Sequence, residues 1–192
     1  TEHRVTQVDR LGDSFQLTTP SRGMTARRVV LATGGRSVPK TGSDGTGYRL
    51  AQSLGHSLAP QTPALVGLVF DGDFHLALSG VSQEVELTVR TEAGRPLRLR
   101  GPLLWTHFGA SGPVVLDASR HWHAARQLNR SVTLSINMLM GDDFDAADRR
   151  VMDLAASQPR VALHNALASL VPGRVADAVV EALSLDPQTP MG

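Results

Sequence analysis

Residues 29–35 read VVLATGG, and residues 42–48 read GSDGTGY. The first stretch predicts a buried β-strand, because its apolar residues form an unbroken run, and the glycines after it let the backbone approach a ligand closely. The second stretch opens an amphipathic helix over residues 45–54, whose N-terminal N–H groups and dipole suit a phosphate or another anionic or polar group. Together the two stretches predict a ligand-binding loop between a strand and a helix.

The residues around this loop predict a small antiparallel sheet. Residues 4–11 and 14–19 alternate apolar and polar side chains on either side of the hairpin dipeptide Gly12-Asp13. Residues 25–32 are expected to form the third strand, which ends in the glycine loop. We therefore expect residues 1–60 to be one unit, followed by a linker.

Beyond the linker the pattern predicts a β-rich unit over residues 61–140. Turn residues separate the expected strands, which favours a small barrel or sandwich. The periodicity of residues 113–120 leaves helix and strand both open, and the sequence HWH at 121–123 is expected in an exposed loop. The expected strands are residues 65–70, 81–90, 97–100, 103–106 and 132–137.

Residues 141–192 change to a helical pattern. Asp142 or Asp143 is expected to cap a helix that ends near Ser157, and two more helices are expected from Pro159 to Leu170 and over residues 174–183. The fold class is therefore α+β, with a small β-barrel or sandwich and a helical subdomain.

Composition excludes several functions. With 19 basic and 18 acidic residues among 192, the net charge of +1 gives no overall electrostatic case for nucleic acid or an anionic membrane. The absence of cysteine excludes disulfides and thiolate metal sites and fits the cytoplasm. No apolar run approaches the ~20 residues of a spanning helix. The first and last residues read as interrupted elements, so we expect a fragment of a longer polypeptide.

Three stretches carry a resemblance to a known family. Residues 29–68, the sequence LSGVS at 78–82 and the sequence LWTHFGASGP at 104–113 resemble the BaiN/YhiN-like family of NAD(P)/FAD-dependent oxidoreductases. The resemblance implies a split FAD-binding domain into which a β-barrel and a helical subdomain are inserted. This chain corresponds to the middle, with a partial, Rossmann-like FAD-binding segment in residues 1–60.

The resemblance also implies the residues of the site. The implied cofactor is FAD, and NAD(P)H would reduce it. The resemblance implies no metal ion. A structural interpretation stays open beside each role: the glycines also suit turns, and His107 also suits a hydrogen bond at a barrel rim. His107 is the catalytic candidate, because an imidazole donates and accepts protons near neutral pH. The implied FAD contacts are Ala32, Thr33, Gly34, Gly35, Gly45 and Gly47, and the substrate-side candidates are Thr106, His107 and Ser111.

The expected function is that of a fragment of a flavoenzyme. Hydride would pass from NAD(P)H through FAD to an unsaturated or carbonyl substrate, and the fragment alone is expected neither to retain FAD nor to be active, because no G-x-G-x-x-G fingerprint is present. The alternative is a non-catalytic recognition module for structured RNA or a protein partner. Four arginines on and around one predicted hairpin could contact phosphates, although solvated charges on an edge strand explain them equally: Arg90, Arg95, Arg98 and Arg100. No metal site is expected, because His121 and His123 lack a third ligand.

Overall fold

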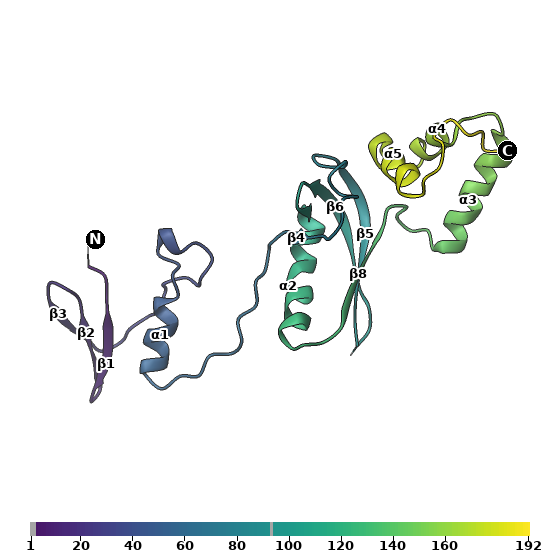
Figure 1. The fold of residues 1–192 in the computed structure, drawn as a ribbon. Helices are drawn as coiled ribbons and strands as arrows, with labels where there is room; N and C mark the ends of the chain where they lie inside the picture. The colour runs from purple at the N-terminus through teal and green to yellow at the C-terminus, as the bar shows by residue number, and fades with distance from the viewer. Residues whose placement is uncertain (1–2, 93) are drawn as a thin grey trace. The chain divides into compact units, whose positions relative to one another are not determined.

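The computed structural model describes residues 3–92 and 94–192 and divides into two compact units (Figure 1). The first ends at Gln61 and the second begins at Thr62.

The first unit is a three-stranded antiparallel sheet followed by a helix. The strands β1 (Gln7–Leu11), β2 (Ser14–Thr18) and β3 (Gly23–Ala26) pair in sequence order. Gly12 has a φ of 57°, a left-handed conformation that glycine adopts without strain, and it confirms the predicted hairpin. A single 3-10 turn, η1 (Pro39–Thr41), precedes the helix α1 (Thr46–Ser53).

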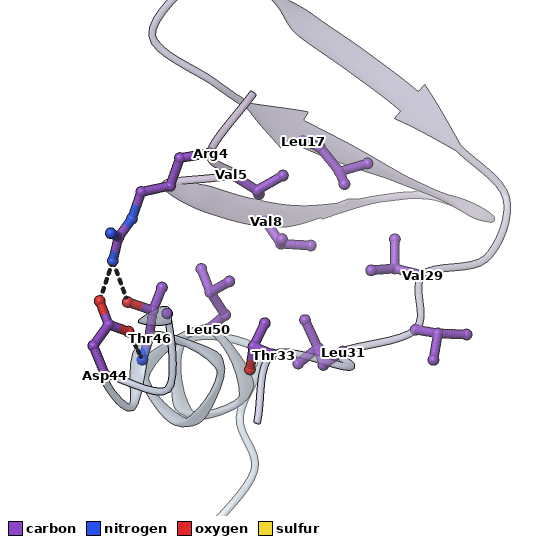
Figure 2. A pocket seen from close by; sticks show the side chains of 12 residues that line it. Arg4, Val5, Val8, Leu17, Val29, Leu31, Thr33, Asp44, Thr46 and Leu50 are labelled. Carbon is purple, nitrogen blue, oxygen red and sulfur yellow. Dashed lines mark hydrogen bonds and ion pairs between the residues drawn. The ribbon is translucent and has the colours of Figure 1, made fainter. Parts of the chain in front are cut away.

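Helix α1 lies against β1 because its apolar side chains occupy one face. Leu50 on α1 and Val8 on β1 are the buried hydrophobic residues in the described part of this unit, 6% and 1% exposed. Their side chains point toward each other in Figure 2. The predicted helix is therefore confirmed, with a small core beneath it.

The predicted third strand is wrong at its C-terminal half. β3 ends at Ala26, residues 29–35 have no regular secondary structure, and Val30 is 86% exposed. A strand that is apolar on both faces is stable only with neighbouring strands to pair with and with elements that cover both of its faces. The described part of this unit offers none, so the apolar run stays extended and uncovered.

The second unit is built on a curled five-stranded antiparallel sheet with the order β4-β7-β6-β5-β8. The sheet does not close, because β4 and β8 each pair on one side only. Its strands are β4 (Leu68–Val69), β5 (Ser82–Thr91), β6 (Leu97–Thr106), β7 (Gly109–Ser111) and β8 (Val132–Asn137). The predicted α+β class, with a barrel-like sheet and a helical cluster, is confirmed.

Two strand predictions differ from the structure. The Gly101-Pro102 dipeptide looked like a turn, yet β6 runs through it without a break. Because β7 pairs only with Leu104–Thr106, the position of Pro102 has a free side where its missing N–H costs no sheet hydrogen bond. The three-residue strand β7 was not predicted, since it is too short for a pattern.

Residues 113–127 form a helix, α2 (Pro113–Gln127), which resolves the ambiguous periodicity. It packs across β5, β6, β7 and β8 and buries Val114, Val115 and Ala118. His121 and His123 lie half-buried near the end of this helix. The predicted exposed loop at residues 121–123 is therefore wrong.

Three further helices complete the second unit. Asp143 caps α3 (Phe144–Ser157) by accepting a hydrogen bond from the Ala146 N–H at 2.9 Å, as predicted. The helices α4 (Leu163–Ala168) and α5 (Gly173–Ala182) pack on each other. α4 begins at Leu163 rather than near Pro159.

One core joins the sheet to the helices. Fully buried side chains come from β5, β6, α2 and α5, and Val175 and Ala178 of α5 share this cluster with Leu78 and Leu87. Arg174 reinforces the contact by donating hydrogen bonds to the carbonyl oxygens of Ser79 and Ala77. Among the helices of the described residues, none has the length and hydropathy to cross a bilayer.

Candidate functional site

The first unit contains a cavity of about 360 Å³ beside the glycine loop (Figure 2). Val8 and Leu17 line it from the sheet, Val29 and Leu31 from the extended segment, and Leu50 from α1. Four polar side chains also line it: Arg4, Thr33, Asp44 and Thr46. The cavity therefore joins an apolar wall to a small polar rim.

The glycine loop is folded onto the start of α1. The Gly45 N–H donates to the Gly35 carbonyl oxygen at 3.0 Å, which ties the two predicted motifs together. Gly45 has a φ of 81°, and a Cβ on Gly47 would lie 1.9 Å from the Thr33 Oγ1. Thr33 thus reaches the helix because residue 47 has no side chain.

The remaining loop glycines also lie against neighbours of the same unit. A Cβ on Gly34 would lie 2.9 Å from the Ser43 Oγ, and one on Gly35 would lie 3.1 Å from the Tyr48 hydroxyl. The structure therefore brings Thr33, Gly34 and Gly35 together with α1. Ala32 is exposed and does not line the cavity.

The N-terminus of α1 carries its own anion. Asp44 accepts a hydrogen bond from the Thr46 N–H at 2.9 Å, and the Arg4 guanidinium donates both to Asp44 and, at 2.8 Å, to the Thr46 hydroxyl. Hydrogen bonds from Thr46 and Arg4 hold the pKa of Asp44 well below its usual range. The N-terminus of α1 therefore does bind an anionic group, as expected, and that group is the carboxylate of Asp44 from the same chain.

Sequence reasoning missed Arg4 and Asp44 as members of the site. An aspartate that accepts from the N–H two residues on forms an Asx turn, and Asp followed by Gly is a recognisable signal of a turn. Arg4 left no such signal, since its contact with Asp44 spans forty residues.

FAD fits this cavity only in part. Its volume lies at the lower end of the range for drug-sized ligands, and FAD is larger than those. The carboxylate of Asp44 repels phosphate, whereas the hydroxyls of Thr33 and Thr46 and the apolar wall suit a ribose and a ring. The unit can therefore supply one wall of an FAD site and not its pyrophosphate seat.

The second group of candidates lies in the second unit, on the β6–β7 hairpin. Thr106 pairs with Gly109, so His107 and Phe108 form a two-residue turn. His107 is exposed, and its ring lies edge-on to Phe108 with 5.2 Å between ring centroids. Its imidazole is therefore accessible to a partner or a substrate.

Thr106 and Ser111 project from the same face of this hairpin, because Ser111 pairs with Leu104 and side chains alternate along a strand. The Thr106 Oγ1 is buried with no hydrogen-bond partner within the described chain. A buried hydroxyl of this kind has a donor and an acceptor to offer.

The glycines and the proline of the 104–113 signature have structural roles. A Cβ on Gly109 would lie 2.2 Å from the Leu68 carbonyl oxygen, and one on Gly112 would lie 2.8 Å from the Pro102 carbonyl oxygen. Gly112 precedes α2, and Pro113 suits the first helical position. Thr106, His107 and Ser111 remain in this signature for chemistry, and so does the buried Nε1 of Trp105, which has no hydrogen-bond partner among the described residues.

No cluster of metal ligands occurs among residues 3–92 and 94–192. His164 on α4 lies beside an acidic residue of α5. Its Nδ1 is 2.8 Å from Asp177 Oδ1.

The fold defines a class of protein: a barrel-like antiparallel sheet with an attached helical cluster, preceded by a glycine loop packed on a helix. The family described as "HI0933-like protein barrel and H2TH domain" matches residues 62–192, so the chain belongs to the HI0933-like family. This result confirms the family predicted by resemblance.

Three curated relatives are similar to the chain. The ribosomal RNA dihydrouridine synthase of Haemophilus influenzae is 27% identical over 92% of this chain, and that of Escherichia coli is 30% identical over 86%. The 3-dehydro-bile acid delta(4,6)-reductase of Clostridium scindens is 35% identical over 62% of this chain. The matches cover 42%, 39% and 29% of these relatives.

Proposed function

We propose that this chain is the middle part of an FAD-dependent oxidoreductase. The first unit would supply one wall of the FAD site, and the second would cover the substrate, with residues 61–140 as the barrel and residues 141–192 as the helical subdomain. The observation that carries the proposal is the glycine loop folded onto α1 beside a cavity, in a chain of the HI0933-like family.

The proposed substrate has a carbon–carbon double bond. The relatives' names describe the formation of dihydrouridine and the reduction of a delta(4,6) bile acid, and both add hydrogen to such a bond. When bound, FAD takes a hydride from NAD(P)H and passes it to the substrate. We place the protein in the cytoplasm, where NAD(P)H is available.

The residues of this chain would position the cofactor and the substrate. Thr33, Gly34 and Gly35 would contact FAD, held in place by Gly45 and Gly47, with Ala32 at the edge of the contact. Hydride addition to a double bond requires a proton at the neighbouring atom. Exposed His107 would deliver it, while Thr106 and Ser111 would bind polar groups of the substrate.

The first experiment tests the cofactor. The full reading frame that contains these 192 residues should purify yellow and lose its flavin absorbance when NAD(P)H is added without oxygen. The 192-residue chain alone should purify colourless. A colourless full-length protein that does not take up added FAD would contradict the proposal.

The second experiment tests His107. His107→Gln in the full-length enzyme should lower kcat about 10²- to 10⁴-fold and leave the flavin spectrum unchanged. A histidine that only stabilises the barrel rim would lower the thermal midpoint and leave kcat of the folded enzyme intact. Arg149→Gln, on exposed α3, is the matched control.

The recognition module remains the second candidate for the second unit. The specific observation that favours it is a group of exposed arginines near one end of the five-stranded sheet: Arg90, Arg95, Arg98, Arg126 and Arg130.

A further inference from the structure

Charge in the second unit is divided unevenly along the chain. Residues 90–130 contain seven arginines and two acidic residues, whereas residues 141–192 contain eight acidic residues and four arginines. The net charge of +1 for the whole chain is therefore the sum of a basic segment and an acidic one.

The fold brings three of its segments to one end of the sheet. β5 pairs with both β6 and β8, with Val89 opposite Leu97 and Thr91 opposite Val132. The turn after α2 leads directly into β8, and the Ser131 N–H donates to Glu92 Oε1 at 3.2 Å. The hairpin end of β5 and β6, the C-terminus of α2 and the start of β8 therefore adjoin (Figure 1).

Five exposed arginines stand on these segments, and we call them the basic end. Arg126 and Arg130 are without an ion pair to any residue that the structure describes, and the nearby Glu92 accepts a hydrogen bond from the N–H of Ser131. The basic end consists of Arg90, Arg95, Arg98, Arg126 and Arg130.

Glu86 compensates one side of this surface. Its buried carboxylate lies 2.7 Å from Arg100 Nε and 3.9 Å from Arg98 Nη1, although both arginine side chains remain more than 60% exposed. Arg90 donates to the Ser135 hydroxyl at 3.2 Å. Exposed Glu84 lies on the same face as Glu86, at the far end of β5. Among the described residues, Arg98 is the member of the basic end with an ion pair, so the charges of Arg90, Arg95, Arg126 and Arg130 are uncompensated.

We propose that the basic end binds the phosphate backbone of structured RNA. Guanidinium groups donate in pairs to phosphate oxygens, and several exposed ones at one end of a sheet can contact successive phosphates. An anionic membrane is disfavoured, because interfacial binding needs an apolar face, and Leu128 is the large exposed apolar side chain among these segments. The inference rests on the proposed function and extends it by naming RNA as the substrate of that enzyme.

The test measures RNA binding by the whole chain. Fluorescence anisotropy of a labelled RNA hairpin is followed while the salt concentration is raised, and log K should fall linearly with log[salt]. The double substitution R126A/R130A should lower the slope by about 1.5, since each phosphate contact contributes roughly 0.7–0.9. R126K/R130K should keep most of the slope, because the charges remain.

A matched control removes the same charge elsewhere. R149A/R160A, at two exposed arginines of the helical subdomain, should leave affinity and slope unchanged. Circular dichroism of every variant checks that it is folded.

Three results would overturn the inference: no salt-dependent binding, an equal loss in R149A/R160A, or tighter binding to phosphatidylserine vesicles than to RNA. This readout does not use the flavin. RNA binding by a protein that fails to bind FAD would leave the inference standing and contradict the proposed function, and the reverse result would do the opposite.

Discussion

The contact between Thr33 and Gly47 decides whether the glycine loop can lie on α1. Alanine is usually better than glycine inside a helix, by about 1 kcal/mol. At residue 47 the added Cβ would overlap the Thr33 Oγ1 at 1.9 Å, and the loop would have to move. The motif is therefore explained first by packing, and any contact with a cofactor depends on that packing.

Gly47→Ala should destabilise the first unit by about 1–2 kcal/mol, since overpacking costs more than helix propensity returns. Urea unfolding followed through Tyr48, the one tyrosine of the chain, measures the effect. The double variant with Thr33→Ala should recover most of the loss. Gly173→Ala meets open space and serves as a control. Equal stability of Gly47→Ala and wild type would show that the loop does not hold this position.

Asp44 predicts a pH dependence of the same unit. Its pKa in the folded protein lies below the value of about 3.9 in the unfolded chain. Its contribution to stability is therefore fully present above that value and is lost as the pH falls toward the folded pKa. Asp44→Asn should be less stable than wild type at pH 7.

The difference in urea midpoint between the two proteins should stay constant above pH ~5 and shrink below pH ~4. Asp13→Asn, in the exposed turn of the β1–β2 hairpin, is the control. A difference that grows as the pH falls would refute the role assigned to Asp44.

At the scale of elements, local signals predicted well and long-range ones did not. Asp143 and the apolar spacing behind it predicted α3, because a cap and a periodic face are both local. The run at residues 29–32 has equally clear strand propensity and remains extended, because a strand needs partners that propensity does not supply. The same distinction applies to the site. The glycine motifs are local in the sequence and were predicted, whereas the contact of Arg4 with Asp44 spans forty residues and was not.

α3 offers a direct measurement of one capping interaction. It buries no residue fully, so its stability depends strongly on local terms. Asp143→Ala should lower the opening free energy of α3 by about 1 kcal/mol, which makes its amide protons exchange about fivefold faster. Asp148→Ala, inside the helix, should change exchange far less. Unchanged exchange in Asp143→Ala would show that the cap contributes nothing.

At the scale of the whole molecule, the two units differ in the number of hydrophobic residues that they bury. Among the described residues, Val8 and Leu50 are the buried hydrophobics of the first unit, and the other seventeen belong to the second. Buried apolar area is the main source of stability, and small units bury a smaller fraction of their surface. The second unit should therefore fold by itself, and the first should be marginal.

Both tryptophans, Trp105 and Trp122, lie in the second unit, so their fluorescence reports its unfolding alone. Residues 62–192 expressed separately should show a cooperative urea transition at the same midpoint as the whole chain. Gly47→Ala should not move that midpoint, although it weakens the first unit. A shift of more than about 1 M in the separate unit, or its failure to unfold cooperatively, would mean that its core is completed by residues before Thr62, since m-values near 1–3 kcal/mol per molar make such a shift a loss of 1 kcal/mol or more.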